Sequence, residues 1–157
     1  MDLKIDTYAA NGALISSVDT RNLDDVKAAK WAEINTYRDV VLSFGVWYMG
    51  YLWGSDPASR ANITGAVAGA TAGVPLPPNF TWRDNNNNNV PFTLTNLITL
   101  GGYVLGYVNE VYNASWTMKA TVDTLTTTDA VDAVVVPLQA WPTNNMDGSM
   151  PVANTTA

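Results

Sequence analysis

The spacing of apolar residues changes several times along the chain, and each change predicts a new element. Near the N-terminus, apolar and polar residues alternate weakly on both sides of Asn11-Gly12, a dipeptide typical of tight hairpin turns. This pattern predicts two short strands. Apolar residues then recur every three or four positions, which predicts a helix from Asn22 to Gly45 with Leu23, Val26, Ile34, Tyr37, Val41 and Phe44 on one side.

The ends of this first helix carry suitable residues. Asn22 can cap it, and Asp24 and Asp25 occupy the first turn, where the helix dipole favours negative charge. Gly45 can end it in the left-handed conformation. The apolar stripe, interrupted by Lys30, could serve a domain core or a coiled-coil-like contact between subunits. We expect the core.

The segment "VWYMGYLW" predicts an aromatic hairpin, because both halves have strand composition around Met49-Gly50. A second helix follows and runs to about Gly73. Asp56 or Ser55 can cap it, with Pro57 in the first turn. Its glycines recur every fourth residue, a spacing that permits a close contact with another helix or strand: Gly65, Gly69 and Gly73.

Five asparagines interrupt the segment "FTWRDNNNNNVPFTL". The flanking residues alternate like strands, and asparagine tolerates turn conformations, so the block predicts a hairpin tip rather than a linker. Asp84 is the only nearby carboxylate, which disfavours calcium binding. Pro91 lacks an N–H and favours an edge strand.

A third, long helix is expected from about Asn96 to Leu125, with Thr95 as its cap. After Thr126 the chain has three prolines, no basic residue and little helical periodicity. It predicts an extended arm that is either disordered or ordered on a partner, and the apolar cluster from Ala133 to Trp141 favours the arm.

These elements predict an α+β fold, in which about three helices pack with short antiparallel β-hairpins. The expected parts are an N-terminal hairpin or connector (1–21), a helical α+β domain (22–125) and an extended C-terminal arm (126–157). We expect a core containing Ile34, Trp82, Leu97 and Trp116. Aromatic residues dominate interface energetics, and the apolar cluster of the expected arm adds Val135. The candidate partner contacts are therefore Trp47, Tyr51, Trp53, Val135 and Trp141. Core packing is the alternative for the first three.

Composition narrows the function. The chain is 47% hydrophobic and 14% charged with a net charge of −6, and its eight basic residues are scattered, which argues against nucleic-acid binding and against attraction to anionic membranes. Cysteine and histidine are absent, so a disulfide framework, thiolate metal sites and the usual general base are excluded.

The longest apolar stretch, from Leu97 to Val108, is about a dozen residues against roughly 20 for a membrane span. No signal-peptide pattern opens the sequence, so we expect a soluble protein made in the cytoplasm.

No catalytic motif is visible. Glu33 and Glu110 are the only glutamates, and Glu33 lies three residues after Lys30 on the same expected helix, where an ion pair explains it. Asp56 and Asp84 fit cap and turn roles. We therefore expect no enzymatic activity, cofactor or metal.

Three segments together resemble a tailed-bacteriophage family that carries only a domain-of-unknown-function label. "VKAAKWAEINTYRD" resembles its opening pattern, "DPASRANITGA" its second helix, and "TWRDN…VPFTLTNLITLGGYVLGYVNEVYNASWTMKATVD" its hairpin and long helix. The matching residues are Lys27, Lys30, Ile34, Arg38, Ser59, Arg60, Ile63, Trp82, Arg83, Asp84, Leu97, Tyr112, Ser115, Trp116, Lys119 and Asp123. The asparagine block and the small-sided second helix depart from the pattern.

The resemblance implies a non-enzymatic structural role in a phage tail, as a tail-fibre or baseplate-associated subunit located in the virion. Its partners would be other tail, baseplate or fibre proteins, and the first-helix stripe allows a homo-oligomer such as a trimer. The alternatives are a tail-fibre assembly chaperone and a glycan-binding receptor module. Exposed tryptophans at the tips of "WYMGYLW" and "TWRDNNNNN" would favour the glycan-binding module.

Overall fold

The computed structural model describes residues 4–136, and the expected Trp141 contact lies outside this range. The fold is α+β, as the sequence predicts, and its strands form three separate antiparallel pairs. In chain order the elements are β1 (Lys4–Tyr8), β2 (Leu14–Asp19), α1 (Leu23–Leu42), β3 (Val46–Tyr48), β4 (Tyr51–Trp53), α2 (Pro57–Thr71), β5 (Thr81–Arg83), β6 (Asn89–Pro91), α3 (Leu94–Thr124) and α4 (Thr128–Asp132).

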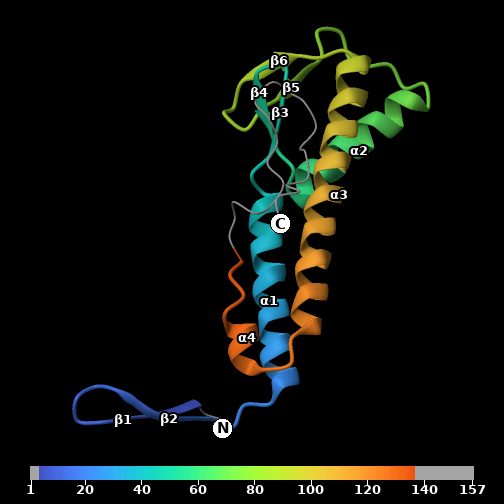
Figure 1. Ribbon diagram of the computed structural model, residues 1–157. Helices are drawn as coiled ribbons and strands as arrows, with labels where there is room; N and C mark the ends of the chain where they lie inside the picture. Colours follow the sequence, from blue (N-terminus) through green and yellow to red (C-terminus); the bar gives the residue numbers. More distant parts are fainter. Residues whose placement is uncertain (1–3, 137–157) are drawn as a thin grey trace.

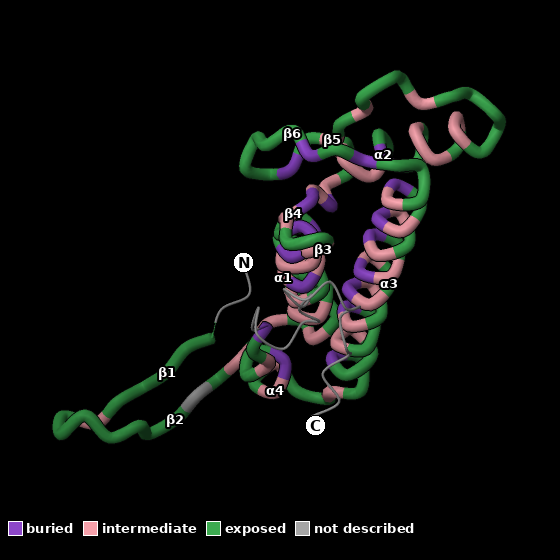
Figure 2. The backbone as a smooth tube through the Cα atoms, turned by 90° about the horizontal axis from the view of Figure 1, so that it is seen from above, coloured by how far each residue is buried: buried purple, intermediate pink, exposed green. Residues whose placement is uncertain are grey.

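Helices α1 and α3 lie side by side and form the long axis of the molecule (Figure 1). α2 packs on the upper part of α3, the β3–β4 and β5–β6 hairpins lie at the upper end, and α4 packs on the lower part of α1. The buried residues line the sides of α1 and α3 that face each other (Figure 2). Ile34 and Leu97 are 0% exposed, which confirms both as core residues, and Trp82 packs partly buried against the same core.

The helix caps are set by local side chains, as the sequence predicts in two cases of three. The Asn22 side chain accepts from the Asp24 N–H, and that of Asp56 accepts from the Ala58 and Ser59 N–H groups. α3 begins earlier than expected, because Thr93 rather than Thr95 is its cap. Thr93 forms a reciprocal capping box with Asn96, which satisfies two backbone donors at once.

Ser55, the other candidate cap of α2, is instead fully buried. Its hydroxyl donates to the Leu42 carbonyl at 2.6 Å and accepts from the Gly45 N–H at 3.0 Å. Gly45 adopts the expected left-handed conformation at φ +88°. A Cβ there would lie 2.5 Å from the Trp53 carbonyl oxygen, so the turn after α1 requires glycine.

The asparagine block is a hairpin tip, as expected. Asp84 is buried, and its carboxylate accepts from the Asn86 N–H at 2.9 Å, the Asn88 N–H at 2.7 Å and the Asn88 side chain at 2.8 Å. Asn87 has a left-handed φ of 65°, which asparagine tolerates. The Asn85 N–H also donates to the Leu52 carbonyl at 2.8 Å, so the tip is tied to β4.

The core assignment of Trp116 is wrong, and Trp53 takes the core position that was the alternative to a partner contact. Trp116 is 56% exposed, because it lies one residue beyond buried Ser115 and about 100° further around α3. Trp53 is 1% exposed, and its ring packs at 4.8 Å from the Phe92 ring while its Nε1 donates to the Tyr48 carbonyl. Trp53 is therefore a core residue, and Trp116 is a surface residue.

The remaining expected contacts differ in exposure. Trp47 and Tyr51 are partly buried, and Tyr51 packs against the core. Val135 is 74% exposed, so its role in a contact stays a prediction.

The region after α3 begins differently from the extended arm that the sequence predicts. Thr127 caps the short helix α4 by accepting from the Ala130 N–H. Val131 and Val136 are 0% and 5% exposed, so this part of the chain joins the core. The prolines that disfavour a helix begin only at Pro137, outside the described residues.

The repeated glycines of α2 make no close contact within the described chain. A Cβ at Gly65, Gly69 or Gly73 would meet nothing within 4 Å. Gly73 has a φ of +91° and follows the last turn of the helix, where glycine is favoured. The close contact expected from this spacing is therefore absent among the residues that the structure describes.

Candidate functional site

The N-terminal hairpin, formed by β1 and β2, projects from the lower end of the molecule (Figures 1 and 2). Ile5 pairs with Val18 in its antiparallel register, which shifts between Thr7 and Tyr8. Five large apolar side chains on it are 55–65% exposed: Ile5, Tyr8, Leu14, Ile15 and Val18. A lone two-stranded hairpin is marginally stable in water, and exposed apolar residues beside unpaired strand edges are typical of a contact surface.

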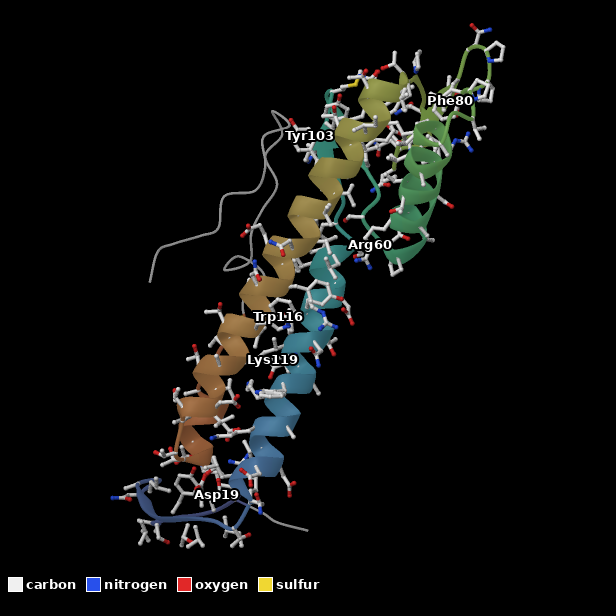
Figure 3. All side chains as sticks on the ribbon, turned by 90° about the vertical axis from the view of Figure 1, so that its right-hand side faces the viewer. Asp19, Arg60, Phe80, Tyr103, Trp116 and Lys119 are labelled. Atoms are coloured by element: carbon white, nitrogen blue, oxygen red, sulfur yellow. The ribbon has the colours of Figure 1, made fainter. Side chains whose placement is uncertain are left out.

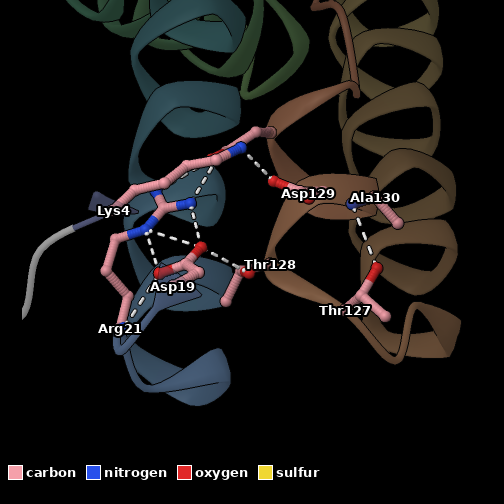
Figure 4. A network of polar contacts seen from close by, with 8 residues as sticks. Lys4, Asp19, Arg21, Thr127, Thr128, Asp129 and Ala130 are labelled. Atoms are coloured by element: carbon pink, nitrogen blue, oxygen red, sulfur yellow. Dashed lines mark hydrogen bonds and ion pairs between the residues drawn. The ribbon is translucent and has the colours of Figure 1, made fainter. Parts of the chain in front are cut away.

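Polar contacts hold the base of this hairpin against α4 (Figure 4). Arg21 Nη2 lies 2.6 Å from Asp19 Oδ2 and 2.6 Å from Asp132 Oδ2. The Thr128 hydroxyl donates to Asp19 Oδ2 at 2.6 Å, and Lys4 pairs with Asp129. The hydrogen bonds from Arg21 and Thr128 hold the pKa of Asp19 well below its usual range. The network therefore fixes where the hairpin leaves the body.

A second exposed surface runs along one side of α3, and we call it the α3 side face. It consists of Ile98, Leu105, Tyr112 and Trp116, whose spacings of seven and four place them on one side of the helix. Ile98 is 48% and Leu105 is 71% exposed. In the upper half, α2 borders a groove of about 810 Å³ whose apolar lining includes Ile63, Val67, Ile98, Leu105 and Val108.

In the lower half, α1 supplies aromatic and cationic side chains. The Arg38 guanidinium lies 4.9 Å from the centre of the Tyr112 ring, and Lys119 Nζ lies 5.5 Å from that of Trp31. Asn35 Oδ1 accepts from both Arg38 Nη1 at 2.9 Å and Lys119 Nζ at 2.5 Å. Burial and the nearby Arg38 lower the pKa of Lys119. Two cations thus converge on one neutral oxygen.

Figure 3 shows Arg60, Trp116 and Lys119 along this one side of the molecule. The Arg60 Nε is buried and has no hydrogen-bond partner among the described atoms. Four residues that carry the family resemblance come together here: Arg38, Tyr112, Trp116 and Lys119. Sequence reasoning missed the surface, although the apolar residues spaced by seven along α3 are its signal.

The carboxylates considered for catalysis have structural partners. Glu33 Oε2 lies 2.7 Å from Lys30 Nζ, which confirms the expected ion pair on α1. Asp56 is a helix cap, and Asp84 holds a turn. Within residues 4–136, no group of three or more acidic side chains could hold a metal ion.

The fold and these two surfaces define a small α+β protein with a projecting hairpin and an exposed helix face. The chain belongs to the family described as Domain of unknown function (DUF4376), whose model matches residues 25–135. The match includes α4 and leaves out the N-terminal hairpin. No curated protein and no solved structure matches the chain. In the part of the chain that the structure describes, no helix has the length and apolar character needed to span a membrane.

Proposed function

We propose that this protein is a non-enzymatic structural component of a bacteriophage tail. It serves as a tail-fibre or baseplate-associated subunit that connects to other tail proteins. The phage assignment comes from the resemblance carried by the three segments of α1, α2 and β5–α3. The connecting role is supported mainly by one observation, which is the projecting N-terminal hairpin with its five exposed apolar side chains.

The hairpin has the properties of a connector. Its strand edges are unpaired in the described chain, so a partner can add backbone hydrogen bonds as well as apolar contacts. Its base is held by Arg21, Asp19 and Asp132, which sets its direction and reduces the entropy lost on binding. It also lies outside the residues matched by the family.

A glycan-binding role at the two aromatic hairpins has less support. Trp53 is buried, while Trp47 and Trp82 are partly buried, so the loop tips do not offer the exposed ring faces that such a role needs. The assembly chaperone differs from the tail component chiefly in its fate, because a chaperone leaves the finished particle or remains only as a cap.

Quantitative mass spectrometry of purified virions tests the proposal. We expect a fixed copy number relative to the tail-tube subunit, compatible with the symmetry of a tail ring or fibre. Absence from virions despite expression in infected cells would exclude the structural role and favour the chaperone. Virions assembled with a variant that lacks residues 1–19 should lose this protein while the variant itself remains folded, because the family domain starts at residue 25.

A further inference from the structure

We propose that the N-terminal hairpin of one copy packs on the α3 side face of a second copy of this chain. The inference rests on the proposed function only in taking the hairpin as the connecting element, and it names what the hairpin contacts. One intermolecular contact would then bury apolar side chains from both exposed surfaces.

The hairpin cannot cover the side face of its own chain. It leaves the lower end of α1 and extends past α4, away from α3, in both perpendicular views (Figures 1 and 2). The contacts of Arg21 and Lys4 with α4 hold it in this direction. Its apolar side chains are therefore presented to another molecule.

The two surfaces match in size and character. The six residues of β2 span about 20 Å at roughly 3.3 Å per residue. The α3 side face from Ile98 to Trp116 is about 27 Å long at 1.5 Å per residue. Both expose large apolar side chains, and the groove between α2 and α3 provides the concave part of the receiving surface.

Charge also favours the hairpin of the second copy, rather than its side face, as the surface that packs on the α3 side face. Arg38, Arg60 and Lys119 lie along the side face, and Asp39 on α1 pairs with Arg38. Two such faces packed together would bring like charges into contact. The hairpin carries no such excess of positive charge, since Lys4 and Arg21 pair with Asp129, Asp19 and Asp132 at its base and the exposed Asp6 lies on β1.

Arg60 lines the groove between α2 and α3, so a hairpin docked in the groove would lie beside this cation. A hairpin that docks on a different patch makes a heterologous contact, which gives a ring where the rotation closes and an open filament where it does not.

Sedimentation velocity of the full chain tests this contact, with three double variants made at exposed positions. The hairpin variant is Ile5→Ser/Val18→Ser, and the face variant is Ile98→Ser/Leu105→Ser. The matched control is Val40→Ser/Val74→Ser, which removes two apolar side chains that are 43% and 62% exposed and lie on neither surface. Thermal melts verify that each variant remains folded.

We expect the unmodified chain and the control to gain mass with concentration, and the hairpin and face variants each to stay monomeric. An equal mixture of these two variants should recover a dimer, because one keeps an intact face and the other an intact hairpin. A monomeric unmodified chain would overturn the inference while leaving the virion test of the proposed function intact. A mixture that stays monomeric would also overturn the inference. So would a face variant that still associates, and that result would indicate pairing between hairpin edges.

Discussion

The Tyr107 hydroxyl on α3 donates a 2.6 Å hydrogen bond to the Val41 carbonyl near the end of α1. Tyr107 is 1% exposed, and this bond joins the two longest helices where α1 gives way to the β3–β4 hairpin. The Val41 carbonyl also accepts from the Phe44 N–H at 3.1 Å, so the Tyr107 hydroxyl is a second donor to a carbonyl in the last turn of α1.

Burial raises the pKa of Tyr107 to about 12. The pKa of Tyr107 in the folded protein lies above the ordinary value of about 10. Its contribution to the free energy of unfolding is therefore complete below pH 10 and is lost as the pH rises through 12. Chemical unfolding should show that the free energy of unfolding falls by about 3 kcal/mol over this window. Tyr107→Phe should lower stability at pH 7 by about 1 kcal/mol and remove much of the alkaline loss. Tyr8→Phe, at a 59% exposed position, is the control and should change neither.

Gly45, which precedes β3, and Gly50, which lies in the turn between β3 and β4, should differ in their tolerance of alanine. Gly45 and Gly50 both have positive φ, at 88° and 79°. Gly50→Ala meets nothing within 4 Å and should cost about 1 kcal/mol from backbone strain alone. Gly45→Ala adds a clash with the Trp53 carbonyl and should cost at least about 3 kcal/mol, measured as a lower urea midpoint. Equal effects would contradict the close approach at Gly45.

The asparagine tip should depend on the Asp84 carboxylate. Burial opposes its charge, but hydrogen bonds from Asn88 and Asn86 lower its pKa overall. Its contribution is therefore present above the ordinary pKa of an aspartate and is lost as the pH falls through the lower folded value. In Asp84→Ala the Asn86 and Asn88 amides should exchange with solvent much faster, while amides in the middle of α3 keep their protection. Unchanged exchange at the tip would mean that backbone turns suffice to hold it.

The Arg21 guanidinium should control how the N-terminal hairpin is held. In Arg21→Ala the links to Asp19 and Asp132 are lost, so proteases should cleave the hairpin faster while the melting temperature changes little. Acid should have the same effect in the unmodified chain, because the lowered pKa of Asp19 means that its contribution is lost as the pH falls through the folded value. Arg83→Ala, which removes an exposed cation from β5, is the control and should leave hairpin cleavage unchanged.

The tryptophans at 53 and 116 should respond oppositely to truncation. Trp53→Ala opens a cavity in the core and removes the bond to the Tyr48 carbonyl, so a loss of about 3–5 kcal/mol is expected. Trp116→Ala removes a side chain that is 56% exposed and should cost about 1 kcal/mol or less in the isolated chain. Denaturant unfolding of both variants makes the comparison. A severe loss at Trp116 would place its ring in the core after all.

The sequence predicted local structure well where short-range signals agree. The asparagine tip, the Asn22 and Asp56 caps, the left-handed Gly45 and the Lys30–Glu33 ion pair all involve residues within a few positions of one another or a single backbone conformation. The misplaced α3 cap shows the limit of such signals. Thr93 and Thr95 are both good caps, and the reciprocal bond with Asn96 decides between them.

By itself, then, the sequence determined the types of the elements, their approximate ends and the α+β class, because these follow from periodicity and from local hydrogen bonding. The spacing of Leu97, Leu100, Val104 and Val111 also indicates the side of α3 that is buried. Only the tertiary structure decided that Ser115 lies on this side and Trp116 outside it, and that Leu105 and Trp116 stay exposed on the α3 side face. The contacts of Arg21 with Asp132 and of Lys119 with Asn35 join residues far apart in the chain, and no local spacing encodes such contacts.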